Sequence, residues 1–582
     1  MDKFRLIIFI VLSIGLLFIW EKYFPSNNAN KAIVSSVNNN NNYQASQLDI
    51  PSNNQGLNNQ TSGIQSINTI SNPSSINTTN KNITVTTNTI QAQISTIGGS
   101  LNSLTLLKHG SNTDIKKPYE LLENNTDKLF IAQTGLLSNQ ISDLPNHASQ
   151  FFAGSYNYVL SPDQNTITVV LKNHPFGTNI ASQNASQQGV EINKIYTFKR
   201  DSYVVDVSYK IINHTNIPLS GLSAYFRLLR DDSSAGDTKF VHTYTGAAYY
   251  DSINKFNKVS FKDMKKLDAT MLQDINNGWA GFVQHYFASM WLLNAYGYNP
   301  VCNNEVICKL NFKMIDDNKY ASVGLITNLP IIAANSSYSI TVPLFVGPQS
   351  YDVLTKVAPE LERTKDYGWV YIFATPLFLL LIKLFALVNN WGWAIVLLTV
   401  IVKMILYPLT RASYISMAKM KILAPKMEQL KTKYATDKVK LQQEMLSLYK
   451  TEKVNPIGGC LPMLLQIPVF IGLYWALLSS VELRHASFLW INDLSIADPF
   501  YILPTVLALL MFLQTFLNPA PTDPMQAKMM RFMPVIFSVM FFFFPAGLVV
   551  YWLINQVLSM LQQWYVNNHV TLKLINKKPY KK

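Results

Sequence analysis

A single cation, Lys403, lies inside an otherwise apolar run, Trp391 to Leu409, that is long enough to cross a bilayer. At about 1.5 Å per residue, it lies roughly 18 Å along the expected helix from Trp391. A charge at that depth costs at least about 2.5 kcal/mol on insertion scales, so the ammonium should face water or a partner. One explanation is a stem that snorkels to the nearer headgroups. The other is a water-filled cavity, which Thr399 favours because it lies on the same helical face.

Hydropathy predicts six membrane spans. They run from Phe4 to Trp20, Trp391 to Leu409, Ile457 to Val481, Tyr501 to Phe516, Phe532 to Phe544 and Leu548 to Trp564. No small-residue cleavage site follows the first span, so residues 1–25 are expected to form a retained anchor. The apolar stretch Tyr371 to Val388 contains Pro376 and Lys383 and is expected to lie along the interface within a segment 351–390.

Charge orients these spans. The loop 411–455 holds ten Lys and Arg residues against four acidic residues, and the tail 567–582 is also basic. The positive-inside rule therefore places this loop and both termini in the cytoplasm. Because the lysines cluster beside apolar spans and no nucleic-acid motif occurs, we expect a lipid bilayer and no nucleic acid as the partner of this basic chain.

The segment between the first two spans changes composition twice. Residues 26–82 are rich in Asn and Ser and are expected to form a disordered linker. Residues 83–350 show short alternating runs such as Ile83–Thr86, Thr166–Leu171 and Tyr203–Tyr209, which predict a large antiparallel β-sandwich. Its histidines, His109, His147 and His174, have no metal-ligand or triad spacing, so we expect surface or core positions for them.

Cys302 and Cys308 lie in this β-rich segment, which we place outside the cytoplasm, where a disulfide persists. Pairing and two free thiols are both open at this stage, and a zinc site needs more ligands. Cys460 is expected to be a packed small residue.

Two helical features follow from local patterns. Val353 to Arg363 is expected to form a linking helix. The basic loop is expected to form a helical hairpin, with one helix beginning at Pro425 and a second capped by Asp437. The alternative for this loop is a solvated charged segment with no partner.

No catalytic motif, phosphate-binding loop or metal-binding group occurs in the spans. Gln466, Asn555 and Gln556 do interrupt them, as do several prolines, and polar groups at that depth need protein or water partners. We therefore expect a hydrophilic groove and a protein that is not an enzyme and has no cofactor. The apolar stripe around Met540 fits either lipid-facing packing or a sliding surface for another helix.

From Asp366 to about Trp564 the chain resembles the YidC family of membrane protein insertases. The matching strings include Tyr407-Pro408-Leu409-Thr410, Asn455-Pro456-Ile457-Gly458-Gly459, Trp490-Ile491-Asn492-Asp493-Leu494, Asp523-Pro524-Met525-Gln526 and Phe532-Met533-Pro534. The β-rich segment resembles the periplasmic domain of Gram-negative members, a supersandwich similar to sugar mutarotases, around Ile94 to Gly99. The resemblance implies a five-helix insertase core, residues 391–566, beside the anchor helix and the periplasmic domain.

The resemblance also implies roles for particular residues. Lys403 matches the position of the family's groove arginine. The lysine keeps the positive charge but lacks the planar fork of donors that arginine has. Thr399 and Trp552 resemble groove positions, beside Gln466 and Asn555. Positions on the surface along which substrate helices slide are matched by Ile467, Pro468, Phe470, Val539 and Met540.

We therefore expect an insertase of the bacterial inner membrane that acts on nascent membrane proteins, alone or beside the Sec translocon, with ribosome contact through the basic tail. A small-solute or ion transporter using Lys403 is the main alternative, although no inverted repeat is visible. A membrane-anchored sugar-modifying enzyme would require clustered His and Glu residues in the β-rich segment.

Overall fold

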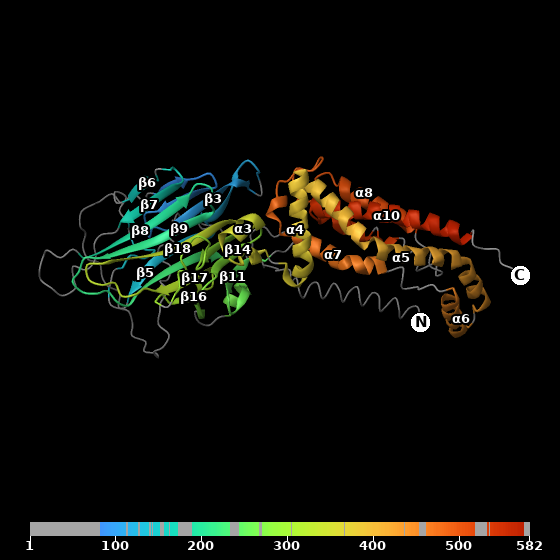
Figure 1. Cartoon of the computed structure of the whole chain (residues 1–582), viewed down its shortest axis with the longest axis horizontal. Coiled ribbons are helices and arrows are strands. Elements are labelled where there is room, and N and C mark those ends of the chain that lie inside the picture. The colour runs from blue at the N-terminus through green and yellow to red at the C-terminus, as the bar shows by residue number, and fades with distance from the viewer. Residues whose placement is uncertain are drawn as a thin grey trace, which may run out of the picture. The chain divides into compact units, whose positions relative to one another are not determined.

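The computed structural model describes residues 82–575, apart from 112–113, 126–127, 139–140, 142–143, 150, 152–155, 162, 173–188, 233–243, 267–270, 304, 366, 436, 453–460, 518–531 and 535. The expected anchor helix, the linker, His174, Cys460 and most of the basic tail lie outside the described residues. The chain divides into two compact units between Thr364 and Lys365, one of strands and one of helices (Figure 1).

The β unit contains two nine-stranded sheets in which every pairing is antiparallel. In spatial order the first sheet is β1 (Asn82–Thr86), β2 (Ile90–Ser95), β3 (Leu101–Gly110), β4 (Pro118–Asn124), β5 (Leu129–Ser138), β10 (Leu222–Asp231), β17 (Tyr320–Asn328), β16 (Cys308–Ile315) and β13 (Met271–Ile275). The second is β12 (Lys255–Val259), β11 (Gly246–Asp251), β14 (Trp279–Gln284), β15 (Phe287–Leu292), β18 (Ser337–Pro348), β9 (Val204–Asn213), β8 (Val190–Lys199), β7 (Thr166–Lys172) and β6 (Tyr156–Leu160). The predicted antiparallel β-sandwich is therefore confirmed.

Alternating sequence produces these strands because successive side chains of a strand point to opposite faces. In β1 the sequence NITVT alternates exposed and buried side chains. The expected run Thr166–Leu171 forms β7, and the run from Tyr203 begins one residue before β9. Strand β10 is buried on both faces along almost its whole length, so it lies within the core of the unit.

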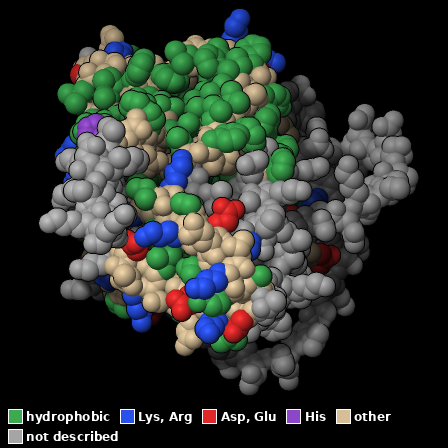
Figure 2. Space-filling model, turned by 90° about the vertical axis from the view of Figure 1, so that its right-hand side faces the viewer, with side chains coloured by type: hydrophobic (Ala, Val, Ile, Leu, Met, Phe, Trp, Pro, Cys, Tyr) green, Lys and Arg blue, Asp and Glu red, His purple; other side chains and the backbone are tan. Residues whose placement is uncertain are grey.

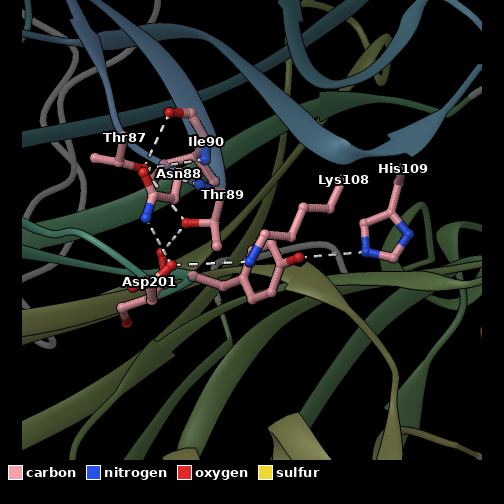
Figure 3. A network of polar contacts seen from close by, with 9 residues as sticks. Thr87, Asn88, Thr89, Ile90, Lys108, His109 and Asp201 are labelled. Carbon is pink, nitrogen blue, oxygen red and sulfur yellow. Dashed lines mark hydrogen bonds and ion pairs between the residues drawn. The ribbon is translucent and has the colours of Figure 1, made fainter.

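Polar contacts join the two sheets where two turns meet. The turn between β1 and β2 meets the turn between β8 and β9, where Asn88 Nδ2 donates to Asp201 Oδ1 at 3.0 Å and Thr89 Oγ1 donates to the Ser202 carbonyl at 2.7 Å. Lys108 of β3 adds an ion pair to Asp201 at 3.8 Å (Figure 3). Strands β1 to β3 belong to the first sheet and β8 and β9 to the second, so these contacts join the layers across a long stretch of sequence.

A lysine lies in the core of the β unit. The side chain of Lys194 in β8 is fully buried, and its Nζ donates to the Gly98 carbonyl at 2.9 Å. It also lies 5.5 Å from the ring centre of Tyr196 and 5.6 Å from that of Tyr209. Burial lowers the pKa of Lys194 well below its usual value, because the low-polarity interior disfavours the charged form.

The structure shows where Cys302, Cys308 and His147 lie, and all three residues are buried. Cys302 and Cys308 form a disulfide with Cα atoms 5.8 Å apart, which closes the short loop that leads into β16. His147 is buried, and its Nδ1 lies 2.6 Å from the Tyr225 hydroxyl. Among the described residues no group of three His, Cys, Asp or Glu side chains is placed to hold a metal ion.

The expected linking helix is wrong in its bounds. Instead of one helix from Val353 to Arg363, the structure has α3 (Tyr351–Val357) and the 3-10 turn η2 (Leu361–Thr364). Ala358 between them is extended, with φ of −152°. The residue before a proline is driven out of the helical region by contact with the proline ring, and Pro359 follows Ala358.

Most of the remaining helical segments lie in the helical unit. They are α2 (Phe261–Met264) in the β unit and, in the helical unit, η3 (Gly368–Val370), α4 (Tyr371–Val388), α5 (Trp391–Lys433), α6 (Lys438–Thr451), α7 (Leu461–Leu478), η5 (Val481–Leu483), α8 (Ile502–Thr515), η6 (Val539–Phe543) and α10 (Ala546–Ile575). Helices α4 and α5 are long and apolar enough to cross a membrane, and α7 and α8 include shorter apolar stretches.

The hairpin is confirmed in part. Asp437 caps α6, and its side chain accepts a hydrogen bond from the Lys440 backbone N–H at 3.0 Å. The prediction that a helix begins at Pro425 is wrong, because α5 continues through Pro408 and Pro425 for 43 residues. An interior proline removes one hydrogen bond and often bends a helix, but the remaining bonds of this helix carry it past both positions.

Candidate functional site

The site is built around Lys403, which α5 carries. Asn390 begins this helix, and its side chain accepts a hydrogen bond from the Trp393 backbone N–H at 3.1 Å. The side chain of Lys403 is half-buried, and its ammonium donates to Ser559 Oγ of α10 at 2.6 Å. Within the described ranges Lys403 has no acidic partner. The charge is therefore held by a neutral hydroxyl and is not neutralised.

Helix α10 receives polar contacts from three other helices. Gln466 of α7 donates to the side-chain oxygen of Asn555, and Gln556 donates to the side-chain oxygen of Gln514 in α8. Nearly two turns further on, Gln562 Nε2 donates to Thr410 Oγ1 of α5 at 2.7 Å. Side-chain hydrogen bonds of this kind join helices inside a bilayer, where water is not available to replace them. The expected pair Gln466 and Asn555 is therefore brought together next to Ser559.

Thr399 and Trp552 occupy different surroundings from this polar set. Thr399 is buried, and its hydroxyl donates to the Ile395 carbonyl of its own helix at 2.7 Å. The half-buried ring of Trp552 packs against Phe470, with ring centres 4.5 Å apart, and against Phe541 at 5.1 Å. Trp552 thus belongs to an aromatic cluster that joins α7, η6 and α10.

The expected sliding-surface residues lie beside that cluster. Ile467 is 42% exposed, Val539 56% and Met540 37%, whereas Pro468 and Phe470 are half-buried. The exposed side chains are apolar and the half-buried ones support them, which suits contact with another apolar chain. The space-filling view shows a separation by chemistry, with hydrophobic side chains gathered in its upper part and Lys, Arg, Asp and Glu in its lower part (Figure 2).

The loop that joins α7 to α8 is folded against the start of α5. Gly392 lies so close to the Phe488 ring that an added Cβ would be 2.1 Å from it. The carboxylate of Asp498 accepts hydrogen bonds from Trp490 Nε1 at 3.1 Å and from the Leu503 backbone N–H at 2.8 Å, which fixes the entry to α8. The loop is therefore packed against the start of α5 at this end of the helical unit.

A buried ion pair anchors the same loop. The Lys365 ammonium lies 3.1 Å from both carboxylate oxygens of Glu482, and the two side chains are only 2% and 15% exposed. The ammonium also lies 4.0 Å from the ring centre of Phe378 in α4. Three segments, namely the entry to the helical unit, α4 and the turn after α7, meet at this cation.

Sequence reasoning missed Ser559. A signal was present, because Ser559 follows Asn555 by four residues and Trp552 by seven, a spacing that places all three along one face of a helix. Serine in an apolar helix commonly bonds its own backbone, however, so spacing alone did not separate a structural serine from one that contacts a charge.

Two family models together cover most of the described chain. The YidC periplasmic domain model matches residues 82–380, and the 60Kd inner membrane protein model matches residues 383–573. A membrane protein insertase YidC of Laribacter hongkongensis is 49% identical over 572 residues, which is 98% of each chain. Another, of Methylobacillus flagellatus, is 41% identical over 587 residues and 99% of each chain. The chain belongs to the YidC family of membrane protein insertases.

A solved structure of an active YidC insertase with its first transmembrane domain resolved matches at 20% identity and a TM-score of 0.37, over 84% of this chain and 93% of that one. Family membership makes the chain a membrane protein insertase of the inner membrane with a periplasmic domain, which the β unit forms. The transporter alternative finds no support among these relatives. The expected fold class, a helical insertase core with a large β domain, is confirmed.

Proposed function

We propose that Lys403 attracts the acidic flank of a nascent membrane protein into a hydrophilic groove, while the apolar part of the substrate moves along α7 and η6. Support for the first half comes from the ammonium, which has a hydroxyl and no carboxylate as its partner in the described part of the chain. Gln466 and Asn555 supply further polar groups for the substrate's flank. Thr399 has its hydroxyl engaged by its own helix and shapes the groove wall.

The proposed movement of the substrate along α7 and η6 rests on the apolar side chains of these segments. Ile467, Val539 and Met540 are exposed, and Trp552 and Phe470 support them from behind. A substrate helix that leaves along this surface exchanges water for apolar contact, which contributes about 25 cal/mol per Å² of buried apolar surface. That contribution drives insertion without a nucleotide or another cofactor, so the chain acts as an insertase and not as an enzyme.

The proposed arrangement in the membrane follows from charge. The α5–α6 hairpin, with Lys426, Lys431 and Lys440 among its cations, and both chain termini lie in the cytoplasm, and the β unit lies in the periplasm. Six helices cross the membrane, with α4 along the interface. The hairpin receives the nascent segment, the basic tail contacts the ribosome, and the protein works alone or beside the Sec translocon.

Reconstitution of the full chain in liposomes tests the role of Lys403. Two short membrane-protein substrates are compared, one with an acidic translocated flank and one with the acidic residues changed to Asn and Gln. We expect Lys403→Glu to reduce insertion of the acidic substrate about tenfold or more, because like charges then meet in a site of low polarity. Lys403→Arg retains the charge and should retain most of the insertion.

Thr505→Ala is the matched control, because Thr505 is an exposed residue of α8, outside the proposed groove and sliding surface, and its hydroxyl donates to the Tyr501 carbonyl. It should insert both substrates normally. Unchanged insertion of the acidic substrate by Lys403→Glu would remove Lys403 from the mechanism. Flux of a small solute through the same liposomes, without insertion, would instead favour a transporter.

A further inference from the structure

Ser559 stands at a junction of hydrogen bonds around the Lys403 ammonium. Its Oγ accepts from Lys403 Nζ at 2.6 Å and donates to the Asn555 carbonyl at 2.6 Å. Ser559 is 6% exposed and Asn555 is 5% exposed, so neither group has ready access to bulk solvent.

These contacts fix the polarity of the hydroxyl. A serine hydroxyl has one proton and two acceptor lone pairs. The proton is directed to the Asn555 carbonyl, so a lone pair of the oxygen accepts the hydrogen bond from Lys403. The oxygen of Ser559 is thus oriented as an acceptor for a cation, in the position that a substrate carboxylate oxygen would take.

The bond to Ser559 keeps the Lys403 side chain from extending toward the lipid headgroups. A lysine on an apolar helix lowers its energy by extending its ammonium toward the headgroups. On α5, Met404 is 68% exposed and Ile405 is 68% exposed, so the neighbouring residues of the same helix face the lipid or solvent side. The bond to Ser559 turns the ammonium instead toward α10, where Asn555 lies with Gln466 of α7 hydrogen-bonded to it.

We infer that Ser559 is a positioning residue for insertion: its hydroxyl holds the Lys403 ammonium in the groove and gives it up to an acidic group of the substrate. A neutral acceptor suits this exchange, because a carboxylate at position 559 would bind the ammonium too strongly for a substrate to displace it. The inference rests on the proposed function of Lys403 and adds to it a residue on the opposite helix.

A double-mutant cycle in reconstituted full-length protein tests the inference. The variants are Ser559→Ala, Lys403→Ala and the double variant, with Ser559→Thr as the conservative replacement. We expect Ser559→Ala to lower insertion of an acidic-flanked substrate about three- to tenfold, in the range expected for loss of a typical intramolecular hydrogen bond. Insertion of the neutral-flanked substrate should change less than twofold. Ser559→Thr keeps the hydroxyl and the bond to the backbone, and should restore insertion.

The cycle separates positioning from a merely structural role. If Ser559 acts through Lys403, adding Ser559→Ala to Lys403→Ala causes no further loss. Equal losses for acidic and neutral substrates, or additive losses in the double variant, would overturn the inference. If Lys403→Ala itself has no effect on the acidic substrate, the proposed function fails first. If Lys403→Ala has its effect and Ser559→Ala has none, only the inference about Ser559 fails.

Discussion

Replacing Lys365 by Met should destabilise the helical unit more than any surface charge change, because it leaves the Glu482 carboxylate buried without its cation. At the 3.1 Å that separates the charged atoms, with an effective dielectric constant of about 20, the attraction amounts to about 5 kcal/mol. Desolvation of the two ions offsets much of this, so the intact pair contributes little net stability. Removal of one partner of a buried pair nevertheless costs about 3 to 5 kcal/mol.

The chain supplies a matched control in Lys426, whose ammonium lies closer to its partner Glu452, at 2.7 Å. Those two side chains are 46% and 35% exposed, so solvent screens the pair, and Lys426→Met should cost less than about 1 kcal/mol. Thermal unfolding of the full chain in detergent, followed by tryptophan fluorescence, measures both variants. Lys365→Met should lower the midpoint by roughly 10 °C, by the scaling for domains of about 150 to 250 residues.

The double variant Lys365→Met with Glu482→Leu completes the test. Because it removes both charges and leaves apolar groups in their place, we expect it to recover most of the lost stability. Equal midpoints for Lys365→Met and Lys426→Met would refute the reasoning, since burial would then have no influence on the cost. A double variant as unstable as Lys365→Met would show that packing against Phe378, and not charge, holds the loop.

Two further predictions concern other parts of the chain. Because burial lowers the pKa of Lys194, the unfolded β unit binds a proton that the folded unit releases. The stability of the β unit should therefore rise with pH, from the lowered folded pKa up to the ordinary value of about 10.4, by as much as about 1.4 kcal/mol per pH unit. Lys194→Met should flatten the dependence of the unfolding midpoint on pH between pH 7 and 9.5, and an unchanged slope would count against a neutral buried amine. Gly392→Ala would place a Cβ 2.1 Å from the Phe488 ring, so the loop between α7 and α8 must shift. Limited proteolysis should then cut this loop at a lower protease concentration than in the unchanged protein. Equal cleavage of the two proteins would mean that the ring moves aside freely.

Local patterns predicted the features that local physics controls. Alternation in Thr166–Leu171 gives β7, and Asp437 caps α6, since strand periodicity and capping depend on neighbouring residues. The apolar runs gave α8 within a residue at each end, Ile502–Thr515 against the expected Tyr501 to Phe516. The continuation of α5 through Pro425 was missed, because a proline weakens a helix locally whereas tertiary packing decides whether the helix ends.

The site was predicted less completely because its contacts join distant segments. Lys403, Gln466 and Asn555 were recognisable as polar residues in apolar runs, yet their partners depend on how α5, α7 and α10 pack. Lys194 shows the same limit in the β unit. Lys194 lies on the same face of β8 as the buried residues Ile192 and Tyr196, so strand periodicity implied its burial. Nothing local indicated that a backbone carbonyl would accept a hydrogen bond from its Nζ.

The unbroken course of α5 means that a single rod about 65 Å long carries both Lys403 and the first arm of the hairpin. Prolines are the positions at which such a rod bends most readily, and Pro408 lies between the lysine and the arm. If the rod stays stiff at Pro408, a force that tilts the arm also turns the lysine. If it bends there, the arm moves while the ammonium keeps its direction, so the stiffness of one helical turn determines whether a load on the arm reaches Lys403.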